Sequence, residues 1–256
     1  MSNLPLNVQL LSDGRVLRLT LARPKANIVN AEMLAALKAG LDAHRDHAGL
    51  AAVLLDAEGP NFSFGASVEE HLPQQCAAML GTIHGVILDM LAYPVPILVA
   101  VRGHCLGGGL ELACAGSMIF AAADAHFAQP EIRLGVFAPA ASCLLPERIG
   151  RASAEDLLLS GRSIDAMEAY RIGLVHAVND APEQLALEYI DANLLPHSSH
   201  ALRHAMRAAR TGFLERIRER IGVVEQIYLE GLMQGRDPVE GLQSFLEKRR
   251  PEWKHE

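Results

Sequence analysis

Residues 101–116, VRGHCLGGGLELACAG, place one charged side chain among glycines and small apolar residues. Glu111 is the only Asp, Glu, Lys or Arg between Arg102 and Asp124. Burying a carboxylate without a partner is costly, on the order of several kcal/mol. We therefore expect either that Glu111 has a partner elsewhere in the fold or that its strained environment serves a reaction.

The composition is that of a globular protein. The 256 residues allow one large domain or two small ones, 50% of them are apolar, and no run approaches the ~20 apolar residues that span a membrane. The N-terminal segment lacks a basic start followed by an apolar core, so we expect no secretory signal. A net charge of −7 argues against nucleic acid as a partner.

The cysteines and histidines show no metal-binding pattern. The four cysteines lack CxxC spacing, which fits a reducing cytoplasm. The histidines at 44 and 47, and at 197, 200 and 204, lie at helical spacing among polar residues without further ligands. We expect solvated helix faces rather than a metal site.

Apolar runs alternate with helical stretches in the first half of the chain, which predicts an α/β fold. The pattern predicts helices over 31–46 and 73–92, and strands over 16–22, 50–58, 93–101 and 117–123. After about residue 140 the pattern becomes helical. We divide the chain into an α/β core over 1–195, which carries the site, and a helical region over 196–256.

The helical region is predicted to form an oligomer. Its segments 198–211 and 213–231 are amphipathic and follow the α/β core in the sequence. Their apolar faces would need a partner surface, which a second copy of the chain could supply.

The glycine turn follows a predicted strand and precedes a short helix, as phosphate-binding loops do. The Walker pattern fails because Gly109 and Leu110 stand where Lys and Ser or Thr are required. The dinucleotide pattern fails because Leu112 occupies the position of the third glycine. The sequence therefore argues against nucleotide binding.

A turn of this kind can also present backbone N–H groups to a developing oxyanion. Glycines allow close approach of a ligand, and a helix N-terminus adds positive partial charge. An oxyanion hole usually takes donors from two segments. The pair Gly65-Ala66 is a candidate for the second segment, although an ordinary surface turn would look the same.

Four segments together resemble the crotonase (enoyl-CoA hydratase) superfamily. They are NFSFGAS (61–67), PVPILVAVRGHCLGGGLELACAG (94–116), AQPEIRLGV (128–136) and LLLSGRSIDAMEAYRIGLVHAV (157–178). The resemblance extends from about residue 7 to FLEKRRPEW near the C-terminus. It implies a spiral of ββα repeats, an acyl-coenzyme A thioester as substrate, no separate cofactor, and a homotrimer or homohexamer.

The resemblance also implies roles for four residues. The N–H groups of Ala66 and Gly108 correspond to those that hold the thioester oxygen. Glu111 and Glu131 correspond to the glutamate pair of the hydratases, whereas many isomerases and hydrolases of the superfamily lack one or both. The sequence therefore resembles a hydratase.

Hydration chemistry agrees with two carboxylates. Two carboxylates that share a buried water can take a proton from the water and give one to carbon, provided that one stays protonated. Glu111 lies between Leu110 and Leu112, a setting that favours a raised pKa, and we expect Glu131 to donate the proton to carbon. The alternative for Glu131 is a salt bridge to Arg133, which would share its face in a strand.

Two departures from the usual hydratase pattern bear on the substrate. Pro139 lies near a turn whose backbone N–H helps to hold water in ordinary hydratases, and proline has no N–H. Ser67-Val68 replaces an acidic-isoleucine pair. The segments FGASVEEHLP and GVFAPAASCLLPERIGR resemble the branch that hydrates a ring diene in anaerobic aromatic degradation.

This resemblance implies the conversion of cyclohexa-1,5-diene-1-carbonyl-CoA to 6-hydroxycyclohex-1-ene-1-carbonyl-CoA. The alternatives are a general short-chain 2-enoyl-CoA hydratase, an isomerase or ring hydrolase, and a non-catalytic scaffold. We expect a compact apolar acyl pocket, whose candidate wall residues are Phe137, Ala138, Pro139 and Ala140. The candidates for coenzyme A contacts are Arg23, Lys25, Ala26 and Lys248, and the alternative for the three basic residues is that they are ordinary surface cations.

Overall fold

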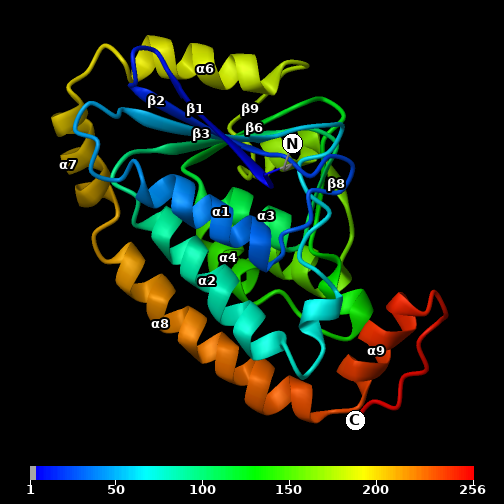
Figure 1. Cartoon of the computed structure of the whole chain (residues 1–256). Helices are drawn as coiled ribbons and strands as arrows, with labels where there is room; N and C mark the ends of the chain where they lie inside the picture. Colours follow the sequence, from blue (N-terminus) through cyan, green and yellow to red (C-terminus); the bar gives the residue numbers. More distant parts are fainter. Residues whose placement is uncertain (1–3) are drawn as a thin grey trace.

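The computed structural model describes residues 4–256 as a mixed α/β fold with a helical C-terminal region (Figure 1). Its large sheet has six strands in the spatial order β1-β2-β3-β4-β6-β9. The strands are β1 (Leu6–Leu11), β2 (Val16–Leu21), β3 (Ala52–Ala57), β4 (Ile97–Val101), β6 (Met118–Ala121) and β9 (Ala177–Val178). β1 and β2 form an antiparallel hairpin, and every later neighbour pair is parallel.

Helices cover both faces of this sheet (Figure 1). On one face lie α1 (Ala31–Asp42), α2 (Cys76–Leu91), α3 (Gly108–Ala115) and α4 (Pro139–Ser160). On the other lies α6 (Pro182–Asn193), whose Ile190 packs with Phe120 of β6. β3 and β4 are buried along nearly their whole length, as expected of parallel strands covered on both faces.

A second, small sheet positions the glycine turn. It is built from β5 (His104–Leu106), β7 (His126–Ala128) and β8 (Ile164–Asp165), and β5 pairs in parallel with β7. The pairing continues beyond the strand as a hydrogen bond of 3.0 Å from the Gly107 N–H to the Ala128 carbonyl. The turn after β5 is thereby held beside the segment after β7.

The predicted strands and helices of the first half are confirmed, with shorter bounds at several ends. The N-terminal strand β1 was not among the predictions. The segment Pro130–Leu134 is a 3-10 helix rather than a strand. The remaining short helices are Glu69–His71 (3-10) and α5 (Ala166–Arg171).

The C-terminal region contains α7 (Ser199–Ala209), α8 (Phe213–Gln226) and α9 (Asp237–Leu246). A π-helical turn, Ile227–Gly231, and a 3-10 turn, Leu232–Gln234, connect α8 to α9. In Figure 1, α8 runs alongside α2. Ile217 and Ile221 on α8 are buried in the main apolar core.

The burial of α8 corrects one premise of the oligomer prediction. Part of the apolar face within 213–231 does not need a second copy, because α2 and α4 of the same chain cover Ile217 and Ile221, whereas Val223 and Ile227 stay exposed. No residue of α7 is buried in the same way. The homotrimer or homohexamer stays a prediction, and so does the division at residues 195 and 196. None of the helices between residues 4 and 256 is long and apolar enough to span a membrane.

Candidate active site

The glycine turn is built for close approach between segments. Gly107 has φ +51°, and a Cβ placed there would lie 2.4 Å from Oε1 of Glu131. A Cβ on Gly109 would lie 2.6 Å from Cβ of Ser63. Only glycine at these positions lets the turn contact both neighbouring segments.

Two backbone N–H groups meet at this turn. A Cβ on Gly108 would lie 3.1 Å from the backbone nitrogen of Ala66, so the two segments contact each other directly. Gly108 begins α3, and Gly65 before Ala66 has φ +102°. Within residues 4–256 neither the Ala66 nor the Gly108 N–H has a hydrogen-bond acceptor. The arrangement can hold an anionic oxygen.

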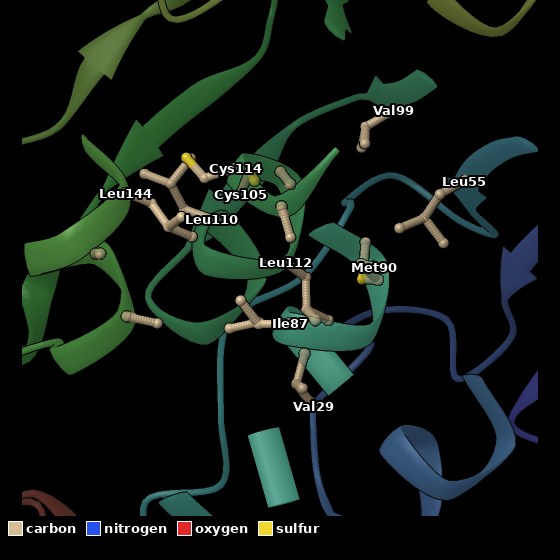
Figure 2. Packing of buried hydrophobic residues seen from close by; sticks show 14 of the residues in the cluster. Val29, Leu55, Ile87, Met90, Val99, Cys105, Leu110, Leu112, Cys114 and Leu144 are labelled. Carbon is tan, nitrogen blue, oxygen red and sulfur yellow. The ribbon is translucent and has the colours of Figure 1, made fainter. Parts of the chain in front are cut away.

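The buried carboxylate of Glu111 has a hydrogen-bond partner, the backbone N–H of Ala141. Its Oε1 accepts a hydrogen bond of 2.8 Å from the N–H of Ala141, in the first turn of α4. The side chain is 5% exposed, and its neighbours Leu110 and Leu112 both belong to the apolar core. Figure 2 shows Leu112 on the side of α2 and Leu110 on the side of α4. The carboxylate is therefore held by the N-terminus of a helix.

The pKa of Glu111 is raised because burial disfavours the charged form. Three influences oppose this rise. In decreasing order they are the charge of His84, the hydrogen bond from Ala141 and the hydrogen bond from Ala140.

Glu131 lies on the 3-10 helix Pro130–Leu134, where its partly accessible side chain faces a cavity. Burial raises its pKa to about 8, and the charge of Glu111 adds to the rise. In the amide orientation that satisfies both side chains, the Gln129 side-chain nitrogen faces this carboxyl group. It lies 3.3 Å from Oε1 and 3.0 Å from Oε2 of Glu131. The raised pKa favours the protonated form of Glu131 beside Glu111.

The salt bridge considered for Glu131 does not form. In a 3-10 helix residues i and i+2 do not share a face, unlike in the strand that the alternative assumed. No ion pair joins Glu131 to Arg133 in the described part of the chain, and Arg133 instead lines the cavity.

The cavity beside Glu131 has a volume of about 690 Å³. The two turns, the Glu131 segment and the C-terminal segment together enclose it. Its lining includes Ile28, Phe64, Ala66, Leu106, Gly107, Glu131, Arg133, Leu134, Val136, Phe245 and Arg249. The volume and the mostly apolar lining are typical of a small-molecule site.

The residues predicted to wall the acyl pocket do not line this cavity. Val136 is the lining residue from their segment, whereas Phe137 packs edge-on against Tyr228 with the ring centroids 5.3 Å apart. Ala138, Pro139 and Ala140 are buried at the start of α4. Their role in the acyl pocket stays a prediction.

The structure places Pro139 at the start of α4, and the lost or moved water contact expected from its missing N–H stays a prediction. Pro139 is the first residue of α4, where a missing N–H costs the helix nothing. The N–H groups of Ala140 and Ala141 that follow are bonded to Glu111. The first turn of α4 therefore directs its N–H donors to the Glu111 carboxylate.

The candidate coenzyme A residues flank the cavity but do not line it. The carbonyl of Ala26 accepts a hydrogen bond of 2.8 Å from the N–H of Phe64, and the carbonyl of Lys25 accepts one of 3.1 Å from Asn61. Their loop is thereby tied to the segment that carries Ala66. Arg23 pairs with Glu32 at 2.9 Å.

At the other side of the cavity, Lys248 precedes Arg249, which does line it. Arg133 and Arg249 are basic lining residues that sequence reasoning missed, although the basic segment EKRR contains the second. No group of three or more His, Cys, Asp and Glu side chains between residues 4 and 256 is placed to hold a metal ion.

The fold and the paired glutamates match a known class of protein. Residues 12–256 match the enoyl-CoA hydratase/isomerase family, and the chain belongs to that family. A crystal structure of an enoyl-CoA hydratase/isomerase from Pseudoalteromonas atlantica superposes with a TM-score of 0.84 at 30% identity, covering 97% of this chain and 99% of that one. The crotonase fold is therefore confirmed.

Two individual relatives of this chain are hydratases that act on different acyl-CoA thioesters. The chain is 59% identical to the cyclohexa-1,5-dienecarbonyl-CoA hydratase of Thauera aromatica, over 98% of this chain and 97% of the relative. It is 33% identical to the 2,3-dehydroadipyl-CoA hydratase of Escherichia coli, over 94% and 95% of the two chains. The protein is a hydratase of the crotonase superfamily.

Proposed function

We propose that this protein hydrates cyclohexa-1,5-diene-1-carbonyl-CoA to 6-hydroxycyclohex-1-ene-1-carbonyl-CoA in anaerobic aromatic degradation. The observation that supports the proposal is that Glu131 lies against Gly107, next to the N–H groups of Ala66 and Gly108, which have no acceptor among residues 4–256, while Glu111 lies in the first turn of the helix that Gly108 begins. The 59% identity to the Thauera aromatica hydratase supports the choice of a ring substrate. The chemistry needs no cofactor besides the coenzyme A that carries the acyl group.

The first half of the reaction uses the oxyanion site and Glu111. The N–H groups of Ala66 and Gly108 hold the thioester oxygen, which makes the ring carbon β to the thioester electrophilic. Glu111 removes a proton from a water molecule, and the water oxygen bonds to that carbon. The displaced electron pair moves onto the thioester oxygen and forms a dienolate.

The second half of the reaction uses Glu131. The electron pair returns through the second ring double bond, whose far carbon takes the proton of Glu131. One C–O bond and one C–H bond have formed, one ring double bond is left, and no atom is oxidised or reduced. The proton on Glu111 then passes through the next water to Glu131, which restores the pair.

The measurement that tests this function compares two thioesters. We expect cyclohexa-1,5-diene-1-carbonyl-CoA to be hydrated with a kcat/KM at least about tenfold higher than crotonyl-CoA, which corresponds to ~1.4 kcal/mol in transition-state binding. Mass spectrometry of the products identifies the hydroxylated ring. Faster turnover of crotonyl-CoA would instead identify a general short-chain enoyl-CoA hydratase.

We also propose that the enzyme works in the cytoplasm as a homotrimer or homohexamer. Leu159, Met167 and Tyr170 are large apolar side chains left exposed on one chain, which supports association. The four cysteines are free and buried, which fits a reducing compartment. A stable monomer at micromolar concentration in light scattering would contradict the oligomer.

A further inference from the structure

A buried hydroxyl lies behind the turn that carries Ala66 and bonds to backbone groups on both sides. It belongs to Ser63, which is fully buried. The Ser63 Oγ donates a hydrogen bond of 2.8 Å to the carbonyl of Asn27 and accepts one of 3.1 Å from the N–H of Gly65. Because its proton is directed to Asn27, a lone pair of the same oxygen is directed to Gly65. The residue that it holds directly precedes Ala66.

The peptide group between Gly65 and Ala66 is held on its carbonyl side. The Gly65 carbonyl accepts a hydrogen bond of 2.9 Å from the N–H of Val29. In a planar trans peptide the C=O and the N–H point in opposite directions, so the Ala66 N–H points away from Val29. That N–H has no acceptor among residues 4–256, and Ala66 lines the cavity. The contact with Val29 therefore helps to set the direction of this donor.

Gly65 is thus fixed through both of its peptide groups. Its N–H is held by the Ser63 hydroxyl and its carbonyl by Val29. Its φ of +102° lies in a region that only glycine adopts readily, and glycine has the widest backbone freedom. Without the bond to Ser63 one of the two anchors is lost, and rotation about Gly65 tilts the Ala66 N–H.

The backbone of Ser63 joins this turn to the strand that leads to the second donor. Its N–H donates a hydrogen bond of 3.0 Å to the carbonyl of His104, and its carbonyl accepts one of 3.0 Å from the N–H of Leu106. Both partners lie on β5, directly before the glycine turn. A Cβ placed on Gly65 would lie 3.5 Å from the backbone nitrogen of Gly108. Ser63 therefore fixes the first N–H donor relative to the second.

Asn27 gives the hydroxyl a rigid acceptor. Asn27 is fully buried, and its side-chain oxygen accepts a hydrogen bond of 2.9 Å from the N–H of Arg23. Its side-chain nitrogen donates bonds of 3.0 Å to the carbonyls of Glu58 and Asn61. Three hydrogen bonds from one buried amide hold this residue in place. The carbonyl that receives the Ser63 proton is therefore fixed independently of the Gly65 turn.

We propose that Ser63 is a positioning residue that directs the Ala66 N–H at the thioester oxygen. The proposal rests on the proposed function, which assigns the N–H groups of Ala66 and Gly108 to that oxygen. Ser63 does not contact the substrate in this account, because its hydroxyl acts through Gly65. The oxygen carries more negative charge in the transition state than in the bound substrate, so a tilted donor should lower kcat more than it weakens binding.

The test is Ser63→Ala, which removes the hydroxyl without adding volume. We expect kcat to fall about tenfold while KM changes by less than about twofold. In infrared difference spectra of the bound product, isotopically labelled at the thioester carbon, the carbonyl stretch should move toward its position in free thioester. Ser63→Cys keeps a weaker donor and acceptor at the same place, so it should lie between Ser63→Ala and wild type in both measurements.

The matched control is Ser160→Ala, at the exposed end of α4. The Ser160 Oγ donates 2.6 Å to the carbonyl of Asp156 and accepts 3.1 Å from the N–H of Arg162, the same pattern with the donor two residues ahead. Its kcat and carbonyl stretch should equal those of wild type.

A merely structural role for the Ser63 hydroxyl has a different outcome. Ser63→Ala would then melt at a lower temperature but keep the kcat and the carbonyl stretch of wild type, and that result would overturn the proposal. If Ser63→Ala does not fold, an unchanged kcat and carbonyl stretch in Ser63→Cys would overturn it instead.

Failure of this proposal can be told apart from failure of the proposed function. A carbonyl stretch that is the same for bound and free thioester in the wild-type enzyme would contradict the oxyanion site itself. A shift on binding to wild type that Ser63→Ala retains in full, with an unchanged kcat, would contradict the role of Ser63 alone. The measurements use whichever thioester the wild-type enzyme hydrates faster, together with its product.

Discussion

Glu111 and Glu131 are both carboxylates in a low-dielectric site, but two different kinds of structure hold them. Glu111 is enclosed between α2 and α4 and accepts a hydrogen bond from the first turn of α4. Glu131 lies on a 3-10 turn, faces the cavity and has a neutral amide, that of Gln129, beside it.

We propose that this difference divides the work between the two side chains. Positive charge and helix N–H groups lower the energy of an ionised carboxyl, whereas burial beside another carboxylate favours the protonated form. The structure therefore favours Glu111 as the base that activates water and Glu131 as the acid that protonates carbon. Pairs of titratable groups with diverging environments are typical of acid–base catalysis.

The largest expected effect comes from removing either carboxyl. We expect Glu111→Gln and Glu131→Gln each to lower hydration by roughly 10²-fold or more, because each loses a positioned acid or base. The amide is nearly isosteric, so thermal unfolding and thioester binding should stay close to wild type. Steady-state kinetics and calorimetric titration with a product thioester measure the two effects. Wild-type turnover in either variant would contradict the assignment of Glu111 as base and Glu131 as acid.

A smaller effect is expected from moving Glu131 without removing it. In Gly107→Ala the new methyl group would lie 2.4 Å from Oε1 of Glu131 and must displace it. We expect kcat to fall roughly tenfold or more, because a small misplacement of a catalytic group is enough. The control is Gly81→Ala, an exposed position within α2 with no atom within 4 Å of the new Cβ. Equal activity in Gly107→Ala and wild type would mean that the turn does not position Glu131.

A third expected effect concerns the dependence of stability on pH. The pKa of Glu131 in the folded protein, about 8, lies above its ordinary value of 4.5. A raised pKa stabilises the fold fully below about pH 4.5, and this contribution is lost as pH rises toward 8. Glu131→Gln does not titrate, so its melting temperature relative to wild type should rise from pH 5 to about pH 8. A difference that is constant with pH would show that Glu131 is not protonated in the fold.

The sequence alone predicted most of the α/β core, because strand and turn patterns are local. The two glutamates came from the resemblance to the crotonase superfamily, and their catalytic roles stay a prediction. It did not show what holds Glu111, since Ala141 is thirty residues away and is brought close only by the start of α4. The local sequence around Pro139 suggested a lost donor, whereas the helix that it begins supplies donors from the next two residues.

The contact between His84 and Glu225 was also beyond sequence reasoning. A single histidine within the apolar helix α2 has no local partner, and Glu225 lies 141 residues further along the chain. The salt bridge considered as an alternative for Glu131 does not form, because Pro130 begins a 3-10 helix where a strand was assumed. Side-chain pairing across distant elements is fixed by tertiary packing, which local patterns do not report.

Infrared difference spectroscopy tests the central comparison most directly. The carbonyl stretch of a protonated carboxylic acid is separated from the bands of carboxylates, so the neutral member of the pair can be observed in the resting enzyme. We expect this band at pH 7 in wild type and in Glu111→Gln, its disappearance in Glu131→Gln, and its loss from wild type as pH rises through about 8. A band that persists in Glu131→Gln and disappears in Glu111→Gln would contradict the assignment of base and acid.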